Sequence, residues 1–159
     1  MVLKFFWLSI QRGFIIKDWA PQMLILGHPA IGGMVTHCGW NSILEGVNAG
    51  LPMITWPVFV EQFYNEKLLT DVLRIGVAVG VKELRNYGQE ETMVMKREEI
   101  EKAVRVLTGD GEEELEMRKR VIKLQDAANK AVEVRGSSHA NLMALINELK
   151  LMKVRKITD

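Results

Sequence analysis

The chain has 159 residues, of which 48% are hydrophobic and 26% are charged, and its formal net charge is +1. This size and composition suit one globular domain with its own core. The nearly neutral charge gives no reason to expect nucleic acid or a membrane surface as a partner, and no apolar run reaches the roughly 18 residues that cross a bilayer. The single cysteine, Cys38, cannot form an internal disulfide, so we expect a reducing compartment, the cytoplasm.

The first half of the chain alternates short apolar runs with helical patterns. Residues 1–12 lack the long apolar region and the cleavage site of a signal peptide, and we interpret this lead-in as a strand-like piece or an irregular start. Strands that alternate with helices predict a parallel sheet built from β-α-β units over residues 13–81. The predicted strands are 13–17, 33–36, 51–56 and 75–81, and the predicted helices are 21–26, 40–49 and 62–73.

The second half of the chain is predicted to be helical. Residues 82–95 are polar and read as a surface loop. Residues 96–152 then hold three helices, at 96–107, 112–134 and from the serines after Gly136 to Met152. Residues 153–159 are expected to form a frayed tail.

The junction after the predicted strand 33–36 has the features of a phosphate site. Ligands of an open parallel sheet bind at the carboxyl ends of its strands. A helix start there offers unpaired N–H groups and the positive end of the helix dipole. Gly39 lets the backbone approach an anion, and His37, Asn41 and Ser42 add side-chain donors. We therefore predict a diphosphate site, the alternative being a packed His37 and a simple helix cap at Asn41 or Ser42.

Other polar and aromatic residues flank this junction. Trp19 could stack on a base, although a tryptophan is more often part of a core. Glu45 lies one helical turn after Asn41 and could reach a ribose hydroxyl, or it could be a solvated helix residue. Glu61 and Gln62 could bind adjacent sugar hydroxyls, or they could simply begin a helix.

The remaining reactive side chains are weaker candidates. Cys38 and His37 are neighbours on a strand end and point in different directions, which is poor geometry for a nucleophile and its base. His28 and His37 lack a metal-ligand spacing with a carboxylate, so we predict no metal. His28 is expected to be a turn residue and His139 a structural one.

The stretch from Trp19 to Gln62 resembles the signature box of plant secondary-product glycosyltransferases, the inverting UDP-sugar enzymes of the GT-B fold. The box has W-A-P-Q at its start, T-H-C-G-W-N-S and a glutamate in its middle, G-x-P and a further proline after them, and an acid-Gln pair at its end. This sequence has the same residues at 19–22, 36–42, 45, 50–52, 57 and 61–62. The stretches FYNEKLL and GSSHANL further along are also similar to the family.

The resemblance implies an α/β fold: a Rossmann-like parallel sheet with flanking helices that forms the C-terminal half of a GT-B fold, truncated at its N-terminus. It also implies a role for each residue of the donor site. The uracil would stack on Trp19, with its edge bonded to the Ala20 backbone, and the ribose would bind Gln22 and Glu45. The diphosphate would be held by His37, Asn41 and Ser42, together with backbone N–H groups near Gly39. The sugar would contact Trp40, Glu61 and Gln62.

The resemblance further implies a donor and a mechanism. A glutamine at the end of the box usually accompanies glucose, so UDP-glucose is the expected donor, with no cofactor. Glu61 departs from the more usual aspartate by one methylene. The family's histidine base, its orienting aspartate and the pocket for a small hydroxylated acceptor belong to an N-terminal domain outside these residues, so no catalytic residue is expected here.

The same resemblance predicts features of the surface. The family's domain begins with two strands before 13–17, so we expect an exposed sheet edge or a gap. Its final helix packs on the N-terminal domain, so we expect an exposed apolar face on that helix. The alternative to a transferase donor half is a non-catalytic sugar-nucleotide-binding module or a degenerate fragment that binds nothing.

Overall fold

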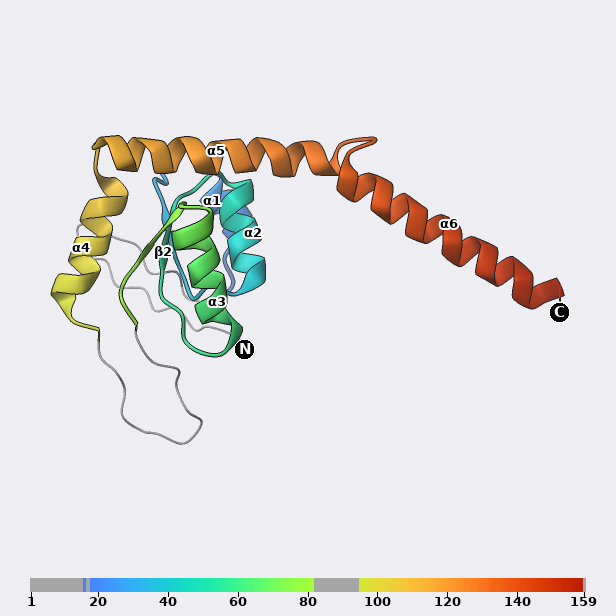
Figure 1. The fold of residues 1–159 in the computed structure, drawn as a ribbon, viewed down its shortest axis with the longest axis horizontal. Coiled ribbons are helices and arrows are strands. Elements are labelled where there is room, and N and C mark those ends of the chain that lie inside the picture. Colours follow the sequence, from blue (N-terminus) through green and yellow to red (C-terminus); the bar gives the residue numbers. More distant parts are fainter. Residues whose placement is uncertain (1–15, 17, 82–94, 159) are drawn as a thin grey trace, which may run out of the picture.

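The computed structural model describes residue 16, residues 18–81 and residues 95–158. A small α/β body carries a long helical arm (Figure 1). Its elements in chain order are α1 (Gln22–Leu26), β1 (Met34–Thr36), α2 (Trp40–Asn48), β2 (Met53–Thr55), α3 (Glu61–Lys67), the π-helical turn η1 (Leu68–Val72), β3 (Gly76–Ala78), α4 (Arg97–Thr108), α5 (Glu112–Val132) and α6 (Ser137–Thr158).

The described strands form one parallel sheet in the order β1-β2-β3. The last residues of the strands, Thr36, Thr55 and Ala78, lie in register with one another. The carboxyl ends therefore form one flush edge, and the prediction of a parallel α/β sheet is confirmed. The lead-in 1–12, all of the predicted strand 13–17 except residue 16, and nearly all of the loop 82–95 lie outside the described residues.

The two faces of the sheet are covered unequally. On one face, α2, η1 and α5 pack on the sheet and bury a cluster made of Cys38, Ile43, Met53, Leu69, Ile75 and Val121. On the other face, Ala103 and Leu107 of α4 pack against Ile54 and Val79. Val35 of β1 lies in register with Ile54, yet its side chain is 59% exposed. Among the described residues β1 is thus an outer strand, and Val35 on its second face is open to solvent. The expected edge or gap lies before the predicted strand 13–17 and is not described by the structure.

The predicted helix 62–73 is divided in the structure. It begins at Glu61, is α-helical to Lys67 and continues as the π-turn η1. Leu73 N donates to Leu68 O at 2.8 Å, a bond to the fifth residue back. The hydroxyl of Thr70 donates to Glu66 O at 3.0 Å and competes for a carbonyl that an α-helix would use. A wider turn relieves this competition.

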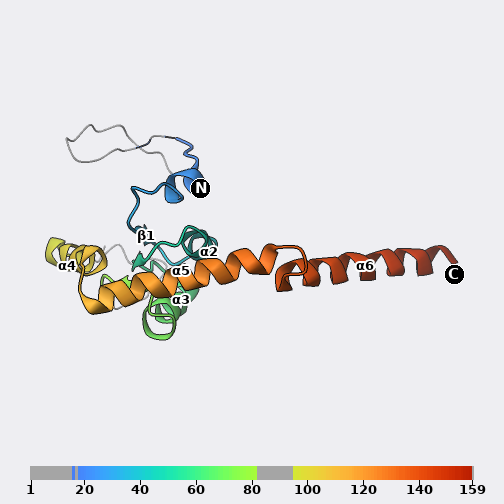
Figure 2. The same cartoon turned by 90° about the horizontal axis from the view of Figure 1, so that it is seen from above.

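The last two helices give the molecule its elongated shape. In Figures 1 and 2, α5 runs along the body and α6 projects away from it. The prediction that the last helix ends at Met152 is wrong, because α6 continues to Thr158. None of the described helices has the length and hydropathy needed to cross a bilayer.

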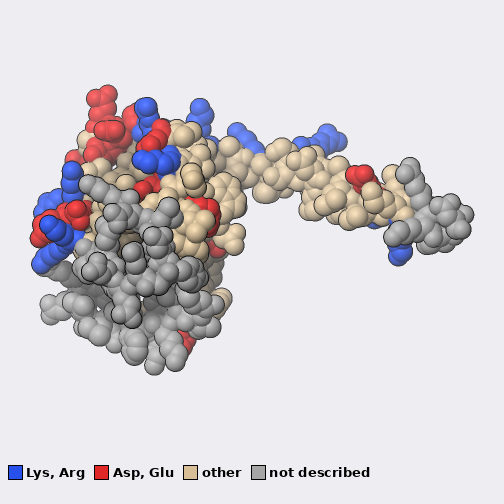
Figure 3. Space-filling view, turned by 60° about the horizontal axis from the view of Figure 1, so that its bottom comes forward, with Lys and Arg blue, Asp and Glu red and all other residues tan. Residues whose placement is uncertain are grey.

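The projecting helix exposes an apolar surface, as expected. Figure 3 shows that uncharged residues dominate this arm. The large apolar side chains that are exposed on α6 include Leu142, Met143, Leu145, Leu149, Leu151 and Met152.

Candidate functional site

A left-handed residue turns the chain from β1 into α2. Cys38 has φ 66, which is uncommon for a residue with a side chain. Its N–H donates to Thr36 Oγ1 at 3.1 Å, and its thiol lies 3.7 Å from Thr36 O. Gly39 follows in an extended conformation and is the N-cap of α2. The start of α2 therefore lies at the carboxyl edge of the sheet.

The first turn of α2 offers free backbone donors. In the part of the chain that the structure describes, no side chain caps this helix, and its first backbone bond is from Ile43 N to Gly39 O at 3.1 Å. The N–H groups of Trp40, Asn41 and Ser42 precede that bond and are available to an anion. Because Gly39 is the N-cap, the alternative in which Asn41 or Ser42 caps the helix is wrong.

His37 lies directly over Gly39. Its side chain is exposed, so it is not a packed core histidine. A side chain at position 39 would collide with His37 Nε2. Gly39 has φ −66, which any residue can adopt, so its value here is the space that it leaves beside the imidazole. An anion at this turn would meet an imidazole and several backbone N–H groups together.

A side-chain hydrogen bond joins α1 to α2. Gln22 Nε2 donates to Glu45 Oε2 across 23 residues of sequence. Glu45 is half-buried, and α1 packs against α2. The structure thus brings together the two residues predicted to bind ribose, on the helix whose first turn carries the free donors.

The segment before α1 is at the surface. Trp19 is 83% exposed, so it is not a core residue and its indole face is open to solvent. Ala20 O already accepts a hydrogen bond from Gln22 N at 2.8 Å. Trp19 is near Gln22 in the chain, but no described bond ties it to His37.

The loop after β2 places Glu61 and Gln62 differently from each other. Glu61 is exposed at the first position of α3. Gln62 is buried, and its Oε1 accepts hydrogen bonds from Val58 N at 2.8 Å and Phe59 N at 3.2 Å. The side-chain oxygen of Gln62 is therefore already bonded to the loop, and only the side-chain amide nitrogen remains available to a ligand. Trp40 is 52% exposed at the start of α2.

Two polar residues that face inward from α3 were not predicted from the sequence. Asn65 Nδ2 donates to Cys38 O at 2.9 Å, and Glu66 Oε2 accepts from Thr55 Oγ1 at 2.6 Å. Burial raises the pKa of the Glu66 carboxyl, although its bond from Thr55 acts in the opposite direction. The only signal in the sequence was their place in the stretch FYNEKLL, where two polar residues interrupt an apolar helix face.

Cys38 is unsuited to nucleophilic chemistry. Its side chain is fully buried, and burial together with the charge of Glu66 raises the pKa of its thiol to about 12. A thiol with such a pKa is almost wholly protonated at neutral pH. The prediction that Cys38 is a poor candidate for a nucleophile is confirmed.

The other histidines hold turns. His28 Nδ1 accepts from Ala30 N at 3.1 Å, and His139 Nδ1 accepts from Arg135 N at 3.4 Å, beside the left-handed Arg135 that precedes α6. Both predicted structural roles are confirmed. Within the described ranges no three His, Cys, Asp or Glu side chains lie close enough to hold a metal ion.

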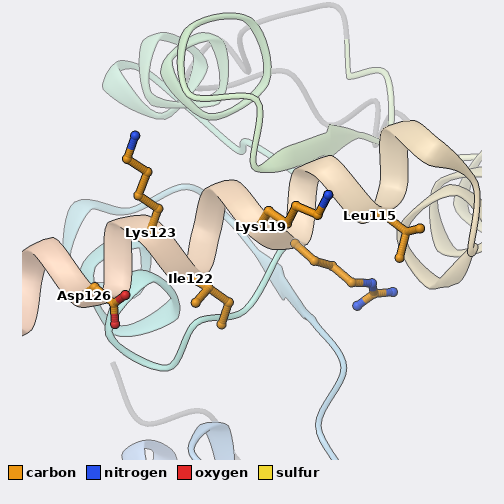
Figure 4. A pocket seen from close by; sticks show the side chains of 6 residues that line it. Leu115, Lys119, Ile122, Lys123 and Asp126 are labelled. Carbon is orange, nitrogen blue, oxygen red and sulfur yellow. The ribbon is translucent and has the colours of Figure 1, made fainter.

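A shallow cavity on α5 lies away from the predicted site. Figure 4 shows side chains projecting from α5, and the lining residues are Leu115, Arg118, Lys119, Ile122, Lys123 and Asp126. Ile122 lies beside Gly50, which follows the C-terminal end of α2. The cavity is therefore at the opposite end of α2 from the free donors.

Comparisons with known proteins agree with this arrangement. The family model described as "UDP-glucoronosyl and UDP-glucosyl transferase" matches residues 9–109, more than half of the chain. The chain is 57% identical over 146 residues to a soyasapogenol B glucuronide galactosyltransferase of Glycine max, covering 92% of this chain and 30% of that protein. It is 50% identical over 141 residues to UDP-glycosyltransferase 73C6 of Arabidopsis thaliana, covering 87% of this chain and 28% of the relative.

Solved structures give the same result. The fold matches that of UGT73P12 of Glycyrrhiza uralensis, complexed with glycyrrhetinic acid 3-O-monoglucuronide, with TM-score 0.87 and 57% identity over 92% of this chain and 30% of that one. It matches UGT71G1 of Medicago truncatula, complexed with UDP-glucose, with TM-score 0.71 and 37% identity over 84% of this chain and 27% of that one. The chain thus spans about 30% of the length of the relatives it matches.

Proposed function

Since the chain belongs to the UDP-glucuronosyl and UDP-glucosyl transferase family, we propose that it forms the donor-binding part of a UDP-glycosyltransferase. The observation that carries this proposal is the hydrogen bond between Gln22 and Glu45. It connects the segment that starts at Trp19 to α2, whose first turn has free N–H groups. Glu45 is four residues after Asn41, about 6 Å along a helix axis, which suits a ribose beside a diphosphate.

Each part of the donor would meet a different part of this edge. The uracil stacks on the exposed indole of Trp19, with its edge at the Ala20 backbone, and the ribose hydroxyls bind Gln22 and Glu45. The diphosphate binds His37, Asn41, Ser42 and the N–H groups around Gly39. The sugar lies toward Trp40, Glu61 and Gln62. The uncapped turn of α2 and the exposure of His37 support the diphosphate assignment.

We infer that the donor sugar is glucose. The final glutamine of the box supports this, and a solved relative is complexed with UDP-glucose. A relative at 57% identity is named as a galactosyltransferase, so UDP-galactose is the competing donor. These two sugars differ in the configuration of a single hydroxyl, and one hydrogen bond is enough to discriminate between them.

The transfer itself is a property of the whole protein. A base outside this chain takes the proton of an acceptor hydroxyl, and the oxygen attacks the anomeric carbon of the sugar. The bond between that carbon and the diphosphate breaks with inversion, and UDP leaves with the electron pair. The donors at the start of α2 stabilise the charge that develops on the leaving diphosphate. The acceptor of the whole protein is a small hydroxylated metabolite.

The compartment that we propose is the cytoplasm, because the buried free thiol of Cys38 fits a reducing environment.

A calorimetric titration of the chain tests this proposal. We expect UDP to bind and ADP to bind far more weakly, because only the base differs. UDP-glucose is expected to bind more tightly than UDP-galactose, and the chain alone is expected to transfer no sugar. Equal binding of UDP and ADP, or no binding of UDP, would contradict the proposal and favour the degenerate alternative. Transfer by the chain alone would show that a base lies within it.

A further inference from the structure

The conformation of Cys38 needs support from outside its own turn. A left-handed residue with a side chain is strained, and such strain persists only where surrounding contacts hold it. One contact is local, from the N–H of Cys38 to Thr36 Oγ1 at 3.1 Å. The other comes from a distant part of the chain and holds the carbonyl, since Asn65 Nδ2 donates to Cys38 O at 2.9 Å.

The donor of that second bond is itself fixed. Asn65 lies on α3, and the next residue, Glu66, is buried and accepts from Thr55 Oγ1 at 2.6 Å. Thr55 is the last residue of the central strand β2. Asn65 is therefore presented to Cys38 by a helix that is bonded to the middle of the sheet.

Holding the Cys38 carbonyl also fixes the next N–H group. The carbonyl of Cys38 and the N–H of Gly39 belong to one planar trans peptide unit, in which they point in opposite directions. With the carbonyl directed to α3, the Gly39 N–H is directed away from α3. Gly39 is the N-cap of α2, so the same bond sets where the free N–H groups of α2 begin.

We propose that Asn65 is a positioning residue for the diphosphate end of the donor site. It does not touch the ligand. It holds the left-handed turn at Cys38 and thereby aims the N–H of Gly39 and the first turn of α2 at the diphosphate. This inference rests on the proposed function, because it assigns a ligand to that turn.

The test compares Asn65→Leu with a matched control, Gln125→Met. Gln125 Nε2 donates to Asn48 O at 2.8 Å, so the control removes the same kind of bond at the other end of α2. Calorimetry with UDP and with uridine separates the phosphate contribution from the nucleoside contribution. We expect Asn65→Leu to weaken UDP binding about tenfold, the effect of about one hydrogen bond to a charged group, and to leave uridine binding unchanged. Gln125→Met should change neither affinity.

A second measurement follows the amide of Cys38 directly and requires no ligand. Cys38 is the single cysteine, so selective ¹⁵N-cysteine labelling gives one amide resonance. That resonance should move in Asn65→Leu and stay in place in Gln125→Met. If Asn65→Leu does not fold, the smaller change Asn65→Ala takes its place in both measurements.

The outcomes distinguish the inference from the function beneath it. Unchanged UDP binding in a folded Asn65→Leu variant overturns the inference and leaves the proposed function intact. Equal weakening of UDP and uridine shows a general structural role and also overturns it. If the wild-type chain binds no UDP, the proposed function fails first and the inference fails with it.

Discussion

The two halves of the candidate site differ in how far they are buried in the core. The diphosphate half, residues 37–42, is attached to the core: Cys38 is buried within it, Ile43 is buried directly after it, and Asn65 ties it to α3. The nucleoside half, residues 19–26, has no buried residue in α1 and places Trp19 83% in solvent. The first half is thus held by the buried core, whereas the second half is held at the surface, by the packing of α1 on α2 and the bond from Gln22 to Glu45.

The largest expected effect is on stability and concerns the core beneath the diphosphate half. Leu69→Ala should lower the free energy of unfolding by about 2–5 kcal/mol, because Leu69 is fully buried in that cluster. Leu24→Ala on α1 should change it by no more than about 0.5 kcal/mol, since Leu24 is 78% exposed. Urea unfolding measures both. Similar losses in the two variants would show that α1 is as firmly packed as the core.

The next effect is on binding and concerns Trp19. Trp19→Ala should weaken UDP binding by about 1–3 kcal/mol, the usual contribution of one base stacked on an aromatic ring. Tyr64→Ala is the control, because Tyr64 is 79% exposed on α3 and outside the proposed site. Calorimetry that finds equal UDP affinity for Trp19→Ala and wild type would refute the stacking role.

A smaller effect is expected at the bond that joins the halves. Gln22→Met removes the hydrogen bond to Glu45 and one ribose contact, so UDP binding should weaken by about 0.5–1.5 kcal/mol. The preference for UDP over 2′-deoxy-UDP or 3′-deoxy-UDP should also decrease. Arg105→Met, which removes an exposed side-chain bond to Glu101 on α4, should leave both unchanged. A retained preference in Gln22→Met would remove Gln22 from the ribose site.

The smallest expected effect is a change of stability with pH that is caused by the buried Glu66. The pKa of Glu66 is raised in the folded state, so as pH rises the unfolded chain loses this proton first. The contribution of Glu66 to stability is therefore complete below the ordinary glutamate pKa and declines as pH rises through the folded one. Glu66→Gln should remove this decline from urea-unfolding curves measured across that range.

The matched control for this measurement is Glu116→Gln on α5. Glu116 is exposed, and its bond from Lys119 lowers its pKa, which is the opposite direction. The decline with pH should therefore remain in that variant. If the decline is unchanged in Glu66→Gln, some other group causes it.

Much of the fold could be predicted because its boundaries are marked by local chemistry. Gly50 follows α2 with φ +68, and Gly136 packs so closely on the Lys130 and Ala131 carbonyls that no side chain would fit. Such glycines locate helix ends in a sequence. The end of α6 was predicted wrongly, since no comparable marker stands at Met152. The helix at 62–73 was predicted, but its change to the π-turn η1 was not, because the competing bond of Thr70 depends on geometry.

One contact of the candidate site agrees with its prediction, whereas the way the site is built was not predicted. The family resemblance placed Gln22 and Glu45 together, and the structure shows a hydrogen bond between them. The left-handed conformation of Cys38 could not be predicted, because residues with a side chain rarely adopt it. The inward direction of Asn65 could not be predicted either, because its partner is a backbone carbonyl 27 residues away.

Local sequence patterns were enough to predict the alternation of strands and helices and the residue types that gather after each strand, because periodicity and turn residues are properties of neighbouring residues. The family was recognised from the resemblance of the motifs at residues 19–62. Three features could be known only from the three-dimensional structure. Gln62 Oε1 accepts hydrogen bonds from Val58 N and Phe59 N, and α4 leaves Val35 exposed. The third feature is the bond by which α3 holds the turn at Cys38. Those outcomes depend on which groups meet across the sheet, and hydrogen bonds between distant residues leave no pattern in the chain.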